Sequence, residues 1–184
     1  MTQIKINYVY EVLLLLLKKD SYGRELAKSL KTSLTRIQST LTELRDTNVL
    51  DYKVEGKNHL YFIKKNLISK SYILNAENYK LTKILIKYPE LEPIFQDLIQ
   101  KSKSELIILF GSYAKETAKK ESDIDIYIET TNQEVKEKVQ KIYDLLSVKI
   151  GEFNPDNLLI KEIIKNHVII NGGEKYYEKV KFFS

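Results

Sequence analysis

The sequence contains no cysteine and no tryptophan, and only three prolines and six glycines among 184 residues. The lack of cysteine excludes disulfide bonds and thiolate metal ligands, and it fits a reducing compartment. The longest apolar run, Val12–Leu17, has six residues, which is far too short to span a membrane. A signal peptide is not expected either, because Lys18, Lys19 and Asp20 follow this run in place of a small-residue cleavage site. We therefore expect a cytoplasmic protein without a membrane partner.

Acidic residues are scarce in the first part of the chain. Residues 1–70 contain 13 lysines and arginines against 7 acidic residues, whereas the remaining 114 residues contain 17 against 18. The net charge of +5 therefore comes from the first part alone. A basic N-terminal region beside a nearly neutral remainder indicates a module that meets a polyanion, followed by a module with another role.

Hydrophobic spacing predicts three helices and a hairpin within residues 1–70. Apolar residues recur at intervals of three or four along each helical segment, which is typical of a buried stripe. Gly56 can take the positive φ that a short hairpin turn needs. The predicted helices span Tyr8–Lys18, Tyr22–Leu30 (capped by Asp20-Ser21) and Leu34–Thr47 (capped by Thr32-Ser33), and the hairpin strands span Leu50–Val54 and His59–Ile63.

Three helices followed by a basic hairpin resemble a winged helix-turn-helix domain, a common DNA-binding module of prokaryotic regulators. The resemblance implies that the third helix enters a major groove and that the hairpin contacts the adjacent backbone. Arg36 is the candidate for reading bases, and the hairpin lysines are candidates for phosphate contacts. The alternative is a module for protein interaction or dimerisation. The candidate DNA-binding residues are Thr35, Arg36, Ser39, Thr42, Lys53 and Lys57.

Residues 71–104 are predicted to form connecting helices between two domains. Apolar residues recur at helical spacing between Ser71 and Lys87, and Pro93 suits the first turn of a further helix. Connecting helices of winged-helix regulators often pair with their own copies, so a homodimer is the expected assembly.

Two short polar motifs follow in the remainder of the chain. The apolar run Leu106–Phe110 ends in Gly111-Ser112, and Ser122-Asp123-Ile124-Asp125 opens another run further on. Alternate residues of a strand face the same side, so Asp123 and Asp125 project together. Two adjacent carboxylates repel each other, and a Mg²⁺ ion, which prefers oxygen ligands, would relieve that cost. Free backbone N–H groups at a strand-to-helix corner attract phosphate, so the stretch predicts a site for a metal and a phosphate.

Together these motifs resemble those of the nucleotidyltransferase superfamily of DNA polymerase beta type, and especially its small, minimal domains in prokaryotes. The segment Lys165–Glu174 resembles the end of such domains, so the resemblance covers Glu105–Tyr177. The predicted order of strands and helices at residues 105–184 suits an α+β domain, with a small mixed sheet and helices on one face. The alternative is a strand, a helical turn and a strand whose acids only face solvent. The residues on the family motif are Gly111, Ser112, Tyr113, Ala114, Ala118, Ser122, Asp123 and Asp125.

The resemblance implies a nucleotide substrate and catalytic metal ions. Asp123 and Asp125 would hold two Mg²⁺ ions that bridge the triphosphate of a bound NTP, with ATP as the expected donor. Gly111, Ser112 and Lys115 would bind the phosphates.

Three departures from the family pattern bear on catalysis. Lys115 stands where arginine is usual, which keeps the charge but loses the bidentate geometry. Glu116 stands where glycine is usual, which calls the shape of the loop into question. Strict alternation along the next strand places Lys149 where the family has a third carboxylate. Glu152 is the candidate for this catalytic role if Gly151 forms a β-bulge, and otherwise the site is altered or inactive.

Two functions follow. The first is a Mg²⁺-dependent transferase that moves a nucleotidyl group, with AMP expected, to a protein or a nucleic acid, and that is tethered to DNA. Minimal nucleotidyltransferases often act as antitoxins that modify a partner toxin, so a protein acceptor is included. The second is a DNA-binding transcriptional regulator whose transferase fold senses nucleotides or holds a partner. Lys149 favours the second function, and the intact Gly-Ser and Asp-x-Asp motifs favour the first.

Overall fold

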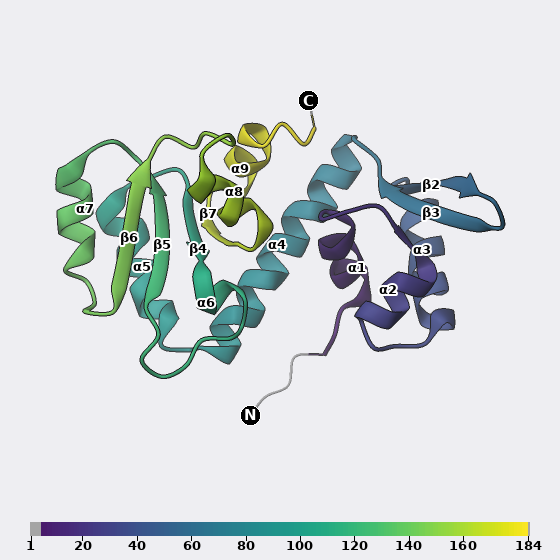
Figure 1. Cartoon of the computed structure of the whole chain (residues 1–184), viewed down its shortest axis with the longest axis horizontal. Coiled ribbons are helices and arrows are strands. Elements are labelled where there is room, and N and C mark those ends of the chain that lie inside the picture. The colour runs from purple at the N-terminus through teal and green to yellow at the C-terminus, as the bar shows by residue number, and fades with distance from the viewer. Residues whose placement is uncertain (1–4, 184) are drawn as a thin grey trace. The chain divides into compact units, whose positions relative to one another are not determined.

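The computed structural model describes residues 5–183 and shows them as two compact units (Figure 1). One unit runs to Tyr79 and the other from Lys80 to Phe182, so the division falls inside helix α4 (Leu67–Lys87). Residues 80–104, which the sequence places among the connecting helices, thus belong to the second unit. Within the described range, no helix has both the length and the apolar character needed to cross a membrane.

The first unit packs three helices and the start of α4 beside a small antiparallel sheet. The predicted helices and hairpin strands are present, and their ends lie within two residues of the predicted ones. Residues such as Leu13, Ile37 and Leu44 have essentially no exposed surface and form the core. The elements are α1 (Tyr8–Leu16), β1 (Ser21–Tyr22), α2 (Gly23–Ser29), α3 (Leu34–Asp46), β2 (Leu50–Glu55) and β3 (Asn58–Ile63), with strand order β1-β3-β2.

The two predicted helix caps of this unit have different outcomes. The Ser33 hydroxyl accepts a hydrogen bond from the Arg36 backbone N–H at 3.2 Å, which confirms the predicted cap of α3. The predicted cap of α2 by Asp20-Ser21 is wrong. Ser21 is buried in β1, where it pairs with Tyr61 of β3, and α2 begins at Gly23, one residue later than a Ser21 cap requires.

The second unit is built on a four-stranded mixed sheet with strand order β6-β5-β4-β7. Strand β5 pairs antiparallel with β4 and parallel with β6, and β4 pairs antiparallel with β7. The strands span Ile107–Phe110 (β4), Ile124–Glu129 (β5), Leu146–Gly151 (β6) and Val168–Asn171 (β7). This α+β arrangement and its mixed sheet agree with the sequence-based prediction.

Helices lie on both faces of this sheet, so the expectation of helices on one face is wrong. Ile124, Ile126 and Ile128 share one core with α5 (Leu91–Ser102) and α7 (Gln133–Gln140). On the opposite face, Tyr127 contacts the Phe153 ring, and Phe153 contacts Tyr176 of α9. The buried aromatic side chains of the C-terminal segment are what bring it onto that face. The remaining helices are α6 (Gly111–Ala114), α8 (Leu158–Lys165) and α9 (Gly173–Lys179).

Candidate functional site

The Gly-Ser corner (Gly111-Ser112) lies against the strand that carries Asp125. Phe110 of β4 pairs with Asp125 of β5, so the next residue, Gly111, lies directly over the Asp125 carboxyl group. A Cβ atom at Gly111 would come within 2.0 Å of Asp125 Oδ2, far inside van der Waals contact. Gly111 also has φ +69°, a conformation that favours glycine. The two motifs therefore form one site, which requires glycine for both space and backbone conformation.

The two aspartates differ in their surroundings. Asp123 is exposed just before β5, whereas Asp125 is partly buried inside the strand. Burial raises the pKa of Asp125 above its ordinary value, and the negative charges of Asp123 and Glu162 act in the same direction. A hydrogen bond from Ser147 and the positive charge of Lys149 oppose this rise in pKa. The pair therefore carries unfavourable negative charge, which a bound cation would relieve.

The donor set fits Mg²⁺ only if a substrate completes it. Among residues 5–183, no group of three or more His, Cys, Asp or Glu side chains is placed to hold a metal ion. Mg²⁺ is commonly bound by one or two carboxylates together with substrate phosphates, rather than by a cage of protein ligands. Asp123 and Asp125 match that smaller set of ligands.

The register of β6 decides which residues accompany the aspartates. Ser147 pairs with Asp125, and Lys149 pairs with Tyr127, so these side chains follow one another on the face that carries Asp125. Lys149 is exposed there, at the position expected from strict alternation. The sequence analysis did not single out Ser147, although its position two residues before Lys149 on the same strand face was the available signal.

Glu152 lies away from the aspartate pair, contrary to its expected role as the third carboxylate. The pairing of β5 with β6 continues without a shift to Gly151, so the bulge that this role required is absent from this pair of strands. Gly151 pairs with Glu129, four residues beyond Asp125, a separation of about 13 Å at 3.3 Å per residue. The Glu152 charge instead contributes, after burial and Glu129, to the raised pKa of Tyr127.

A different acid approaches the site from α8. Glu162 is exposed, and its charge acts on Asp125, as described above. Its Oε1 atom accepts a hydrogen bond from Lys115 Nζ at 3.5 Å. The sequence analysis missed Glu162 because α8 is distant in sequence from both motifs, and helical periodicity alone identifies it only as a residue of the polar face.

Glu116 adopts the backbone conformation that glycine would favour at its position. Its φ is +58°, so the loop after α6 keeps a left-handed residue although the side chain is not glycine. Lys87 Nζ donates hydrogen bonds to the Glu116 carbonyl oxygen at 3.0 Å and to its carboxylate at 3.1 Å. The Glu116 charge is thus paired with Lys87, and the substitution does not abolish the loop conformation.

We expect the variant Glu116→Gly to be about 1 kcal/mol more stable than Glu116→Ala. Both variants lose the ion pair with Lys87, but only glycine adopts the positive φ without steric cost. Urea unfolding followed by circular dichroism measures the difference. Equal stabilities would show that the left-handed conformation of this residue costs nothing.

The candidate DNA-binding residues of α3 are all exposed but do not border the same hollow. Arg36 and Ser39 line a hollow of about 350 Å³ with residues 5–9, and the Arg36 guanidinium lies 5.5 Å from the centre of the Tyr8 ring. Thr35 and Thr42 are exposed on the same helix without lining this hollow.

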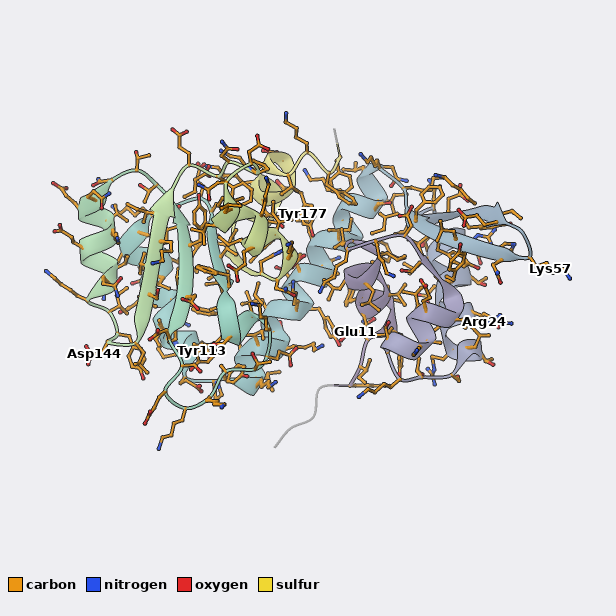
Figure 2. All side chains as sticks on the ribbon, viewed as in Figure 1. Glu11, Arg24, Lys57, Tyr113, Asp144 and Tyr177 are labelled. Carbon is orange, nitrogen blue, oxygen red and sulfur yellow. The ribbon has the colours of Figure 1, made fainter. Side chains whose placement is uncertain are left out.

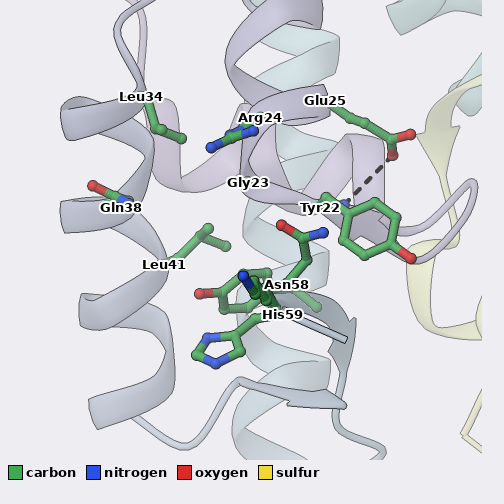
Figure 3. Close-up of a pocket in the computed structure, with 11 residues that line it drawn as sticks. Tyr22, Gly23, Arg24, Glu25, Leu34, Gln38, Leu41, Asn58 and His59 are labelled. Atoms are coloured by element: carbon green, nitrogen blue, oxygen red, sulfur yellow. Dashed lines mark hydrogen bonds between the residues drawn. The ribbon is translucent and has the colours of Figure 1, made fainter. Parts of the chain in front are cut away.

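A second hollow, of about 390 Å³, lies between α2, α3 and the hairpin (Figure 3). Gln38 of α3 and Arg24 of α2 line it, together with Asn58 and His59 of β3. Lys57, which also lines it, lies at the hairpin turn (Figure 2), whereas Lys53 lies along β2, 5.4 Å from the Phe62 ring centre. The sequence analysis did not single out Gln38 or Arg24.

A comparison with known protein families matches residues 80–175, just over half of the chain, to the family described as polymerase beta, nucleotidyltransferase. The matched range contains the Gly-Ser corner, the aspartate pair, Glu162 and all four strands of the second sheet. A comparison with curated proteins finds no match.

Proposed function

The chain belongs to the polymerase beta nucleotidyltransferase family, and from this premise we propose that its second unit transfers a nucleoside monophosphate from an NTP to an acceptor. The observation that carries the proposal is the contact of Gly111 with the Asp125 carboxyl group. It supports the proposal because the Gly-Ser corner, the candidate phosphate site, lies directly beside the carboxylate of Asp125. ATP is the donor we favour, and a protein or a nucleic acid is the acceptor.

The site residues have separate tasks in this reaction. Asp123 and Asp125 would hold Mg²⁺, which offsets negative charge on the phosphates and on the departing pyrophosphate. Gly111 allows the backbone to approach the nucleotide closely, and the Ser112 hydroxyl and N–H bind phosphate. Lys115 adds a single positive charge there, without the two-point contact of arginine.

The direct test is incubation of the purified protein with labelled ATP and Mg²⁺, alone and with candidate protein or nucleic-acid acceptors. We expect label to appear on an acceptor or on the chain itself, and pyrophosphate to be released in equal amount. Binding of ATP without any pyrophosphate release would instead support a nucleotide-sensing role, which the exposed Lys149 beside Asp125 favours.

We propose further that the first unit is a winged helix-turn-helix domain that binds duplex DNA. The order of its elements, the exposed polar side chains of α3 and the basic hairpin support this role. The hollow beside Gln38 adds a candidate for base reading, because glutamine can make a two-point contact with adenine. We also propose that the chain forms a homodimer and that it acts with a partner toxin.

Lys57→Ala is expected to weaken DNA binding uniformly across sequences, because lysine at the hairpin turn would contact phosphate only. The slope of log affinity against log salt concentration should fall by about one unit. Fluorescence anisotropy with labelled duplexes at several salt concentrations measures the slope.

The matched control is Lys138→Ala, which removes an exposed lysine from α7 in the second unit. An equal loss of affinity in both variants would assign the effect to net charge and contradict a contact made by the hairpin. Gln38→Ala should change the ranking of sequences more than it changes the salt slope.

A further inference from the structure

Glu162 forms an ion pair with Lys115, the lysine of the candidate phosphate-binding corner after β4. Lys115 immediately follows α6, and its Nζ lies 3.5 Å from Glu162 Oε1. The two side chains are 43% and 58% exposed, so neither is locked in place by packing. A carboxylate oxygen and a phosphate oxygen are equivalent partners for a lysine ammonium group. Glu162 therefore holds the position on Lys115 that a nucleotide phosphate would take.

The ion pair of Glu162 with Lys115 also lies close to Asp125. The Lys115 backbone N–H donates a hydrogen bond to the Gly111 carbonyl oxygen at 3.2 Å, and Gly111 lies over the Asp125 carboxyl group. The negative charge of Glu162 acts on Asp125 as well. Glu162 comes from the polar face of α8, whose opposite face buries Ile160 and Ile163. The helix is thereby anchored while its acidic side chain remains free to change partners.

We propose that Glu162 occupies Lys115 in the nucleotide-free site, and that a bound triphosphate displaces it and frees it to act as the third carboxylate beside Asp125. This inference rests on the nucleotidyl transfer proposed above. It assigns the missing acid to a helix instead of a strand. It also makes nucleotide binding the event that completes the site.

Exchange of partners is favourable because the competing interactions differ in strength. An exposed lysine–glutamate pair contributes little, since solvent screens it and two flexible side chains must be ordered. A triphosphate carries several negative charges and would also be held by Ser112 and by the cations that Asp123 and Asp125 would bind, so it competes well for Lys115. Repulsion between the phosphates and Glu162 then moves the carboxylate away from Lys115.

The freed carboxylate has a defined task in the transfer. The oxygen of the acceptor hydroxyl forms a bond to the α-phosphorus, and its proton passes to the Glu162 carboxylate. The bond between the α-phosphorus and the oxygen that bridges to the β-phosphate breaks. Pyrophosphate leaves with that electron pair. A positioned base of this kind typically increases the rate by about 10²–10⁴-fold.

The test compares ATP affinity and turnover in Glu162→Gln. Removing the competing charge should tighten ATP binding by about two- to fivefold, as expected for loss of an exposed ion pair. Turnover should fall by about a hundredfold or more, because the base is lost. A residue that only stabilises the fold would not produce opposite changes in affinity and turnover. Affinity is measured by calorimetry with and without Mg²⁺, and turnover by pyrophosphate release.

Three further variants complete the experiment. Glu162→Asp keeps the carboxylate and should recover part of the turnover. Lys115→Met should weaken ATP binding. Glu137→Gln removes an exposed acid from α7, which lies on the opposite face of the sheet, and should change neither quantity. Circular dichroism checks that each variant is folded.

The outcomes separate the two proposals. If the wild-type protein neither binds ATP nor releases pyrophosphate, the proposed function fails, and this inference fails with it. If the wild-type protein is active but Glu162→Gln matches it in affinity and turnover, only the role of Glu162 is overturned.

Discussion

Replacing both Asp123 and Asp125 by alanine is expected to abolish nucleotidyl transfer while leaving the second unit folded. The two carboxylates are the only protein ligands we assign to the cations, and their loss removes charge stabilisation worth several kcal/mol. A loss of about 4 kcal/mol corresponds to roughly a thousandfold in rate. Pyrophosphate release from labelled ATP measures the effect. Equal labelling by this double variant and by the wild-type protein would overturn the assignment of the active site.

The single variant Asp125→Asn adds a readout that does not depend on activity. Burial raises the pKa of Asp125, so the unfolded chain ionises this carboxyl at a lower pH than the folded chain does. The contribution of Asp125 to stability is therefore fully present below its unfolded pKa and is lost as the pH rises through its folded pKa. At neutral pH without Mg²⁺, the asparagine variant should therefore unfold at a higher temperature than the wild type.

The exposed Asp144 provides the control for this measurement (Figure 2). Asp144→Asn removes the same charge from an exposed turn before β6 and should leave the unfolding temperature unchanged. If both variants shift the unfolding temperature equally, net charge and not burial of Asp125 explains the effect. Greater stability after loss of a functional residue is the usual trade-off at a charged site.

Gly111→Ala is expected to cause the largest loss of stability among the single variants considered. The new Cβ would lie 2.0 Å from Asp125 Oδ2 and 2.9 Å from its Cγ, in a backbone conformation with φ +69°. The positive φ costs about 1–2 kcal/mol, and forcing the carboxyl group and the adjacent strand apart adds about 1–3 kcal/mol. Because Asp125 must move, transfer activity should be lost as well.

Gly56→Ala separates the two contributions to this loss. Gly56 has φ +61°, but a Cβ there would meet no atom within 4 Å. The alanine variant should therefore cost only the conformational term, about 1 kcal/mol, measured by thermal unfolding of the first unit. A Gly111 variant no less stable than this one would contradict the close approach to Asp125.

Local patterns in the sequence were sufficient for the helices and the hairpin of the first unit and for the Gly-Ser and Asp-x-Asp motifs of the candidate site. The helix ends of the first unit, its hairpin, the strand before Gly111 and the strand that carries Asp125 follow from hydrophobic period, turn residues and capping residues. These signals act between residues that are close in the chain, so they can be read without a structure. The cap predicted at Ser21 failed because a strand pairing with Tyr61, forty residues away, took precedence.

The sequence by itself determined that this protein carries a Gly-Ser corner and an Asp-x-Asp motif at the start of a strand, and hence where we propose that a nucleotide binds. Only the tertiary structure decided which residues complete that site. The register between β5 and β6 removed Glu152 from it, paired Ser147 with Asp125 and left Lys149 where strict alternation had predicted it. The packing of α8 brought Glu162 to Lys115. Pairing register and helix packing depend on contacts between distant segments, and no local pattern of residue types encodes those contacts.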